Sequence, residues 1–258
     1  MELAIYHAVQ DHVKTSKNID YGGILAAAVT IGEGAQKDIK WATALSSPHR
    51  DKSIAAYDKE MTSLQQTILK RVDESHPKWN QIRKEAVSCR MLLDVKRNGV
   101  TKARCVKQGF KEDKAAADGQ DFNYYSHVAK LSSVRALALR PNRGERTIGI
   151  KDVSTAFLQS HKFQGFVKYV CIKNPLTGLW EYYEQSGPIY GECSAPVRWE
   201  NTLVPWFEEQ GFKRGVNEKS VLYHPERDLV LLVYVDDVMA DGLRDNVEWI
   251  FNLMEKRF

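Results

Sequence analysis

The feature that most constrains this chain is a pair of adjacent aspartates inside an apolar, strand-like stretch. Residues 231–242 read Leu-Leu-Val-Tyr-Val-Asp-Asp-Val-Met-Ala-Asp-Gly, so that Asp236 and Asp237 interrupt a run that suits a buried strand. Burying two like charges costs several kcal/mol unless a cation, a proton or exposure to solvent compensates. A tight hairpin turn suits the pair, because Asp tolerates unusual turn backbone. Taken alone, the string fits solvated turn residues as well as metal ligands.

A third aspartate, Asp152, lies near the end of a strand predicted over 147–153. It is far from Asp236 and Asp237 in sequence, so only the fold can bring the three carboxylates together. Three carboxylates in one cleft require cations, and hard oxygen ligands of this kind suit Mg²⁺. Two such ions about 3.5–4 Å apart activate a hydroxyl and stabilise a leaving pyrophosphate. The aspartates therefore indicate phosphoryl transfer, and an unrelated metal-dependent phosphohydrolase would use the same carboxylates.

The composition of the 258-residue chain fits a globular protein, and its net charge of +4 permits a nucleic-acid partner without requiring one. Residues 94–111 contain six cations and one anion, which fits either a nucleic-acid contact or a solvated basic face. No apolar run approaches the roughly 20 residues of a membrane span, and the first residues lack a signal-peptide pattern. The sequence therefore predicts an intracellular protein, cytoplasmic or nuclear, with no membrane partner.

Hydrophobic periodicity predicts intermixed helices and strands, hence α+β layers rather than a regular βαβ winding. The expected helices cover 53–72, 131–139, 195–210 and 247–258. The expected strands cover 89–110 around an Asn98-Gly99 turn, then 147–153, 166–172, 221–234 and 238–240. Residues 111–120 are expected to form a loop, and residues 1–40 look weakly organised.

Five strings, read together, resemble the reverse transcriptase of copia-type LTR retrotransposons. In chain order they are K-A-R-C-V-K-Q-G-F (102–110), Y-S-H-V-A-K-L (125–131), D-V-S-T-A-F-L (152–158), Tyr190-Gly191 with Ala195-Pro196 and Trp199, and Y-V-D-D (234–237). The family's strings read approximately K-A-R-L-V-A-K-G-F, S-P-V-A-K, D-V-x-x-A-F-L, L-Y-G-L-K-Q-A-P-R-x-W and Y-V-D-D. The likeness covers roughly residue 41 to the end, and a phosphohydrolase leaves the four other strings unexplained.

The resemblance implies an RNA-directed DNA polymerase with a right-hand fold of fingers and palm, truncated before the thumb. Residues 41–150 then form a fingers-like region, residues 151–258 a palm-like region with the Asp-Asp hairpin, and residues 1–40 have no assigned role. The implied partners are an RNA or DNA template with its primer and deoxynucleoside triphosphates. A thumb and an RNase H region would belong to a longer Pol polyprotein.

The resemblance also assigns the catalytic and metal-binding roles. Asp152, Asp236 and Asp237 match the family's palm aspartates, and they are expected to bind two Mg²⁺ ions, with Mn²⁺ as an alternative. The backbone carbonyl of Val153 is a candidate further metal ligand. Tyr234 is expected near the primer end.

Substrate-binding roles fall on other strings. Phe157 matches the aromatic residue that packs under the incoming sugar and disfavours a 2′-hydroxyl, although a core aromatic is the alternative. Lys102 and Arg104 share one face of a predicted strand and match cations that grip the triphosphate. Contacts to the nucleotide or template are expected from Tyr190, Gly191 and Pro196.

Two departures from the family's strings count against full activity. Where the family has L-K-Q, this chain has Glu192, Cys193 and Ser194, so a cation is lost and an anion gained near the expected nucleotide site. Before Asp152 stands Lys151, a cation that would compete with a metal ion. These departures support an alternative, namely a catalytically inactive retrotransposon-derived remnant that at most binds nucleic acid.

Overall fold

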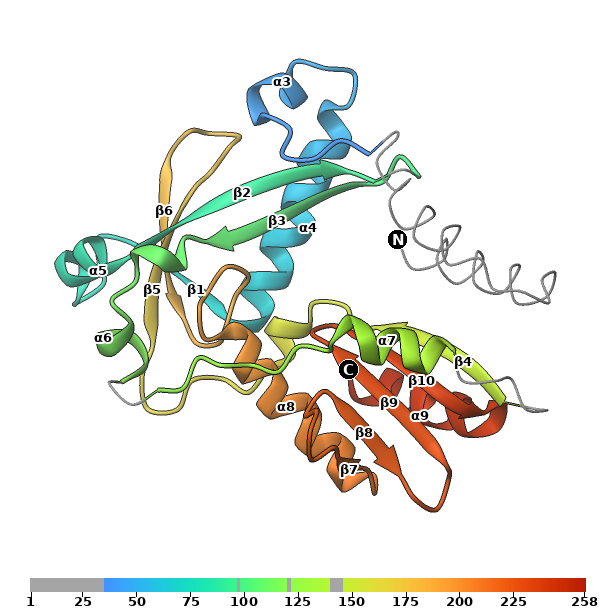
Figure 1. Cartoon of the computed structure of the whole chain (residues 1–258). Coiled ribbons are helices and arrows are strands. Elements are labelled where there is room, and N and C mark those ends of the chain that lie inside the picture. Colours follow the sequence, from blue (N-terminus) through green and yellow to red (C-terminus); the bar gives the residue numbers. More distant parts are fainter. Residues whose placement is uncertain (1–34, 97, 120–121, 140–145) are drawn as a thin grey trace. The chain divides into compact units, whose positions relative to one another are not determined.

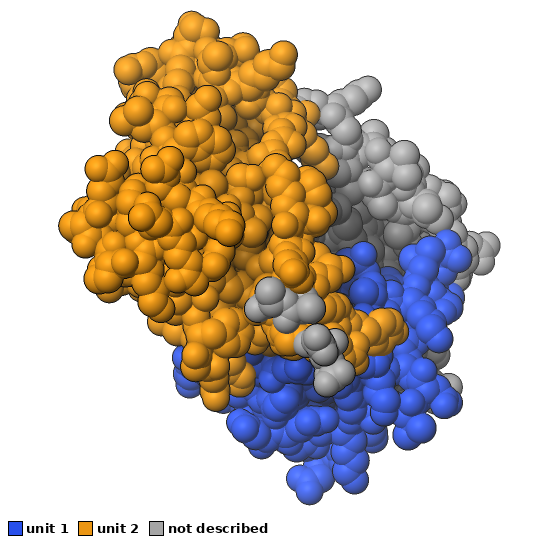
Figure 2. Space-filling model, turned by 90° about the vertical axis from the view of Figure 1, so that its left-hand side faces the viewer, with its two compact units in different colours: residues 1–32, 126–156, 200–258 blue, residues 33–125, 157–199 orange. Residues whose placement is uncertain are grey.

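The computed structural model describes residues 35–96, 98–119, 122–139 and 146–258 (Figure 1). These form two compact units, coloured separately in Figure 2. Unit 1 comprises the described parts of 126–156 and 200–258, and unit 2 comprises the described parts of 33–125 and 157–199. Each unit holds one five-stranded sheet with helices, which is the predicted α+β class. Most of the segment 1–40 lies outside the described residues.

The sheet of unit 2 has the order β1-β6-β5-β2-β3, with one parallel pair, β2 and β5. Its strands are β1 (Leu69–Val72), β2 (Val87–Val95), β3 (Thr101–Lys107), β5 (Lys168–Lys173) and β6 (Trp180–Gln185). The predicted hairpin is confirmed, because β2 and β3 pair on either side of Gly99, whose φ of 76° suits a residue without a Cβ. The first five residues of β5 are all buried, as expected for a central strand covered on both faces.

The helices of unit 2 pack around this sheet. They are α3 (Trp41–Leu45), α4 (Arg50–Thr67), α5 (Trp79–Glu85) and α6 (Lys114–Asp118), with a 3₁₀ turn η2 (Gly109–Lys111). Helix α4 buries Tyr57, Met61 and Leu64, which recur at helical spacing, against core residues of the sheet (Figure 1).

Two sequence predictions in unit 2 are wrong in part. The helix predicted over 53–72 ends at Thr67, because Leu69–Val72 pairs antiparallel with β6 as strand β1. Tertiary pairing thus overrides the helical period of the last few residues. The loop predicted over 111–120 contains the short helix α6, which its alanines favour.

The sheet of unit 1 is antiparallel throughout, in the order β4-β10-β9-β8-β7. Its strands are β4 (Arg146–Asp152), β7 (Lys213–Arg214), β8 (Val221–His224), β9 (Leu229–Tyr234) and β10 (Asp237–Leu243). The helices are α7 (Leu131–Ala138) and α9 (Arg244–Arg257), and α8 (Ala195–Glu209) starts in unit 2 and ends in unit 1. These helices confirm the predicted ones. The strand predicted over 221–234 is two strands, because the chain turns at Asp228, whose φ is 43°.

Helices cover both faces of the unit 1 sheet. Helix α9 packs so closely on β4 that a Cβ on Gly149 would lie 2.6 Å from the ring of Phe251. On the other face, Leu137 of α7 packs with Leu232 and Met239 of the sheet. Side chains of β4 therefore alternate between the α9 face and the α7 face, and this alternation positions the candidate site.

A core substitution tests the packing of α4. Leu64 has no exposed surface, so Leu64→Ala should lower the free energy of unfolding by about 2–5 kcal/mol through lost burial and a cavity. The matched control is Leu179→Ala, because Leu179 lies in the same unit and is 69% exposed. Chemical denaturation of both variants decides the point, and equal losses would contradict the assignment of Leu64 to the core.

Candidate active site

Two strands of unit 1 bring the predicted aspartates to one end of the sheet. In the antiparallel register of β4 and β10, Asp152 lies directly opposite Asp237. Directly opposed residues of an antiparallel pair project from the same face, with Cβ atoms about 4.5–5.5 Å apart. Asp236 precedes Asp237 in the turn that joins β9 to β10. Residues far apart in sequence thus meet through strand pairing.

The turn between β9 and β10 holds the second pair of aspartates in a strained backbone. Tyr234 pairs with Asp237, so the loop consists of Val235 and Asp236 alone. Val235 has a φ of 55°, a left-handed conformation that is rare for a β-branched residue and is stable only where the surroundings impose it. One such restraint is a hydrogen bond from the backbone N–H of Val153 to the carbonyl of Asp236, 2.9 Å long. This bond ties the turn to the end of β4.

The aspartates are accessible to solvent to different degrees. Asp152 is exposed, and Asp236 and Asp237 are half-buried. Val153 is buried, and Tyr234 is 49% exposed at the end of β9. Three carboxylates at one sheet end, with two of them partly removed from water, form a set of hard oxygen donors that fits Mg²⁺ or Mn²⁺.

The predicted competition from Lys151 is wrong. Lys151 is next to Asp152 on β4, and neighbours in a strand project from opposite faces. Lys151 lies on the α9 face, where its ammonium forms an ion pair with the carboxylate of Glu255. Its charge is therefore directed away from the carboxylate of Asp152. That ion pair also holds the pKa of Glu255 below its usual range.

Unit 2 carries the other predicted site residues. Lys102 and Arg104 share one face of β3, as predicted; Lys102 is exposed and Arg104 is partly buried. Arg104 donates a 2.6 Å hydrogen bond to the carboxylate of Asp94 on the neighbouring strand β2. Asp94 also accepts a hydrogen bond from the backbone N–H of Asp38. Sequence reasoning missed this fixed orientation of Arg104, although an acid opposite a cation on paired strands is a signal for it.

Phe157 and Tyr190 lie in contact. Their ring centroids are 5.0 Å apart at 61°, an edge-to-face arrangement. Phe157 belongs to the 3₁₀ turn η3 (Ala156–Gln159), and Pro196 lies in the first turn of α8, where proline is tolerated. The substrate residues predicted on separate strings, Phe157 and Tyr190, thus form one aromatic pair.

Gly191 is required by its backbone surroundings. Its φ is 81°, and a Cβ there would overlap the carbonyl oxygen of Lys107. Lys107 donates its N–H to the carbonyl of Tyr190 at 2.7 Å, and Gly109 donates to Gly191 at 3.3 Å. The segment around Tyr190 and Gly191 therefore lies backbone against backbone along the end of β3.

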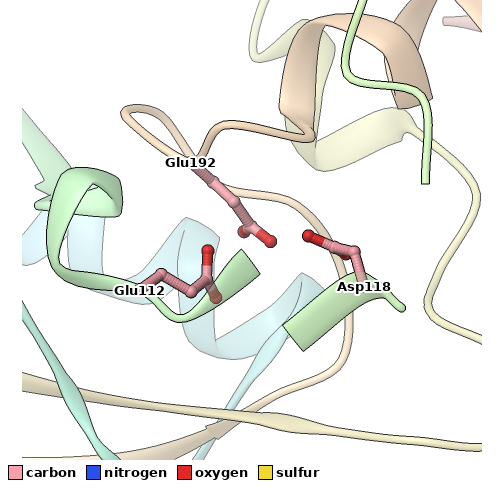
Figure 3. Close-up of side chains that lie close together, drawn as sticks. All are labelled: Glu112, Asp118 and Glu192. Atoms are coloured by element: carbon pink, nitrogen blue, oxygen red, sulfur yellow. The ribbon is translucent and has the colours of Figure 1, made fainter. Parts of the chain in front are cut away.

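Glu192 does not act as an anion exposed near a nucleotide. It is 3% exposed, and with Glu112 and Asp118 it forms a group of carboxylates whose oxygens lie within 4.8 Å of one another (Figure 3). Lys168 lies 2.5 Å from Glu192 and 2.9 Å from Asp118, and Lys107 lies 2.7 Å from Glu112. Ammonium groups thus occupy the space between these carboxylates, which does not fit a metal site. The predicted conflict at Glu192 is replaced by a buried ionic cluster.

Sequence reasoning noted Glu192 only as a departure and missed its cationic partners. The available signal was the alternation of β3, in which Lys107 follows the buried residues Ala103 and Cys105 on the same face. A cation on a core-facing row demands a buried anion. Which anion answers it is decided by the fold.

Comparison with known proteins supplies the family. A family model described as reverse transcriptase (RNA-dependent DNA polymerase) matches residues 78–257. No curated protein matches the chain. A solved structure of telomerase from Candida albicans, in complex with the TWJ fragment of telomeric RNA, is similar at 8% identity with a TM-score of 0.45, covering 80% of this chain and 44% of the telomerase chain. The chain thus spans less than half the length of that protein.

The matched span includes both sheets and all eleven residues that the sequence predicts for the site. The chain belongs to the reverse transcriptase family, whose members use divalent metal ions and bind a nucleic-acid template with its primer. Within the described residues, no helix combines the length and apolar character needed to cross a membrane.

Two alanine substitutions separate backbone strain from steric overlap at Gly191. Gly165 has a similar φ of 79° but open space around the position of a Cβ, so Gly165→Ala should cost about 1–2 kcal/mol of stability from strain alone. Gly191→Ala should cost more, because a carbonyl oxygen must also move. Chemical denaturation compares the variants, and equal costs would contradict the close approach of Gly191 to β3.

Proposed function

We propose that this chain is the polymerase region of a copia-type reverse transcriptase that transfers nucleotides to a primer 3′-hydroxyl with two divalent ions. The observation that carries the proposal is the register of β4 and β10, which sets Asp152 opposite Asp237 at the β9–β10 turn. Family membership supports the same reaction class. The substrates are deoxynucleoside triphosphates and a primed RNA or DNA template.

Asp152 and Asp236 would hold two Mg²⁺ ions, with Asp237 in support and the carbonyl of Val153 as a further candidate ligand. When bound, the ions lower the pKa of the primer hydroxyl and neutralise charge that develops on the phosphate oxygens. The carboxylates themselves are preorganised by strand pairing and by the hydrogen bond from Val153 to Asp236. Preorganised charge is favourable for catalysis because little rearrangement is needed at the moment of reaction.

The reaction is an in-line attack of the primer 3′-oxygen on the α-phosphorus of the nucleotide. The new bond joins that oxygen to phosphorus, and the bond to the bridging oxygen breaks, so that pyrophosphate leaves. In this proposal Lys102 and Arg104 bind the triphosphate, and Asp94 supports the role of Arg104 by fixing its guanidinium. Tyr234, exposed beside the turn, is assigned to the primer end.

The aromatic pair supports a selective role. In the proposal Phe157 packs under the sugar and rejects a 2′-hydroxyl, and Tyr190 braces its ring from the side. Gly191 and Pro196 are assigned to contacts with the nucleotide or template. The selection of DNA precursors would then depend on how firmly the Tyr190 segment is held.

The alternative, a non-catalytic remnant that binds nucleic acid, loses its two supporting observations. Lys151 and Glu192 are both engaged in ion pairs that direct their charges elsewhere. The retained aspartates favour the enzyme. A cytoplasmic or nuclear location and the missing thumb and RNase H regions of a longer polyprotein remain part of the proposal.

Primer extension on a poly-adenylate template with an oligo-thymidylate primer tests the function. Extension should require Mg²⁺ or Mn²⁺ and fall by more than about a hundredfold in Asp236→Asn, because that variant loses a negative metal ligand. The matched control is Asp245→Asn, an exposed aspartate in the first turn of α9, which should retain activity.

The same samples are then tested for binding of the primed template. An enzyme should lose extension but keep template affinity in Asp236→Asn. Template binding without extension by the wild-type chain, under either ion, would favour the non-catalytic alternative.

A further inference from the structure

The buried ionic cluster of unit 2 contains more charge than a core usually holds. Its anions are Glu112, Asp118 and Glu192, and its cations are Lys107, Lys168 and Arg198. The three negative and three positive groups balance. Isolated buried charges are strongly unfavourable, so the cluster is stable only as a complete set.

Each of the two lysines bridges several segments. Lys107, 2% exposed, donates to Glu112 at 2.7 Å and to the side-chain oxygen of Gln185 at 3.1 Å, and lies 3.8 Å from Glu192. Lys168, 6% exposed, donates to Glu192 at 2.5 Å and to Asp118 at 2.9 Å. The lysines thus connect strands β3 and β5 to the segments that carry the three acids.

The protonation states agree with this geometry. Burial by itself would raise the pKa of Asp118, but hydrogen bonds from Lys168 and Arg198 outweigh it and hold that pKa below its usual range. Burial would lower the pKa of Lys168, but the charge and hydrogen bonds of Glu192 and Asp118 raise it. These groups therefore stay ionised at neutral pH.

Glu192 is the most extensively bonded of the acids. Besides Lys168, its carboxylate accepts hydrogen bonds from the side chain of Gln185 at 2.5 Å and from the hydroxyl of Ser194 at 3.2 Å. The backbone N–H of Ile189 also donates to it, at 3.4 Å. A carboxylate bonded from four directions fixes the backbone of its own segment.

That segment is the one assigned to the nucleotide. Immediately before Glu192, Tyr190 and Gly191 accept hydrogen bonds from Lys107 and Gly109, and Tyr190 contacts Phe157. Lys107 therefore contacts the segment twice, through its N–H at Tyr190 and through its ammonium near Glu192. In the family strings quoted above, positions 107 and 192 are alanine and leucine, so an apolar pair there corresponds to an ion pair here.

We propose that Glu192 is a positioning residue: through Lys107 and Lys168 it holds the Tyr190–Gly191 segment against β3 and so fixes the aromatic pair of Tyr190 and Phe157 that receives the nucleotide sugar. The part that concerns the nucleotide rests on the proposed function. The anion that looks like a defect in the sequence is, in the fold, the anchor of a substrate-binding segment.

Charge balance gives a sharp set of variants. Glu192→Leu leaves three cations with two anions, and Lys107→Met leaves two cations with three anions. The double variant restores balance with an apolar pair. Each single variant should therefore unfold at lower denaturant concentration than wild type, and the double variant should recover most of the difference, which is strong non-additivity. The matched control is Glu184→Gln, which removes a partly exposed ion pair of the same unit with Lys70 and His76.

Amide hydrogen exchange measures the anchoring without any need for catalysis. Glu192→Gln, which keeps the shape of the side chain, should speed exchange in peptides covering 105–110 and 188–194 by about tenfold, while peptides from α4 stay unchanged. The double variant should restore slow exchange. Unchanged exchange in Glu192→Gln, or an additive double variant, would overturn the proposal.

Kinetics test the part that concerns the nucleotide. Where the wild-type chain extends a primer, Glu192→Gln should raise KM for the deoxynucleotide by about tenfold with little change in kcat, and should weaken discrimination against ribonucleotides. A general loss of folded protein would instead lower kcat alone and leave discrimination intact, which would overturn the positioning role. An inactive wild-type chain would overturn the proposed function, and hydrogen exchange would then decide the anchoring by itself.

Discussion

The pairing of β10 with β4 is the constraint on which the candidate active site depends. One antiparallel register sets Asp152 opposite Asp237, ties the β9–β10 turn to the end of β4, and directs Lys151 to the face covered by α9. None of these effects needs the others as a cause, because all follow from the alternation of side chains along a strand. The site is thus specified by backbone geometry before any ion or substrate is present.

Unit 2 solves a different problem, the burial of charge. Lys107 and Glu192 lie in positions where an apolar pair would satisfy the core, yet each is tolerated because the other and Lys168 complete a neutral set. Breaking such a set is far more costly than replacing it as a whole. The aromatic pair of Phe157 and Tyr190 lies next to this cluster in the chain and inherits its rigidity.

Much of the fold is readable from the sequence because its signals are local. The Asn98-Gly99 turn, the helix that became α9 and the aspartates at the ends of β4 and β9 follow from short-range patterns. Strand β1 was misread because its pairing with β6 outweighs its own helical period. The partners of Glu192 and Lys151 were missed for a related reason: strand alternation says which face a charge occupies, but the residue that neutralises it comes from a distant segment.

The opposed projection of Lys151 and Asp152 makes β4 tolerant of some genetic changes and intolerant of others. A point substitution on the α9 face alters one packing contact with that helix. A one-residue deletion upstream within the strand would shift every later side chain to the opposite face. The ammonium of Lys151 would then occupy the place of a metal-binding carboxylate, and an aspartate would be driven under α9 beside Phe251. Insertions and deletions in this strand should therefore be eliminated by selection long before most substitutions.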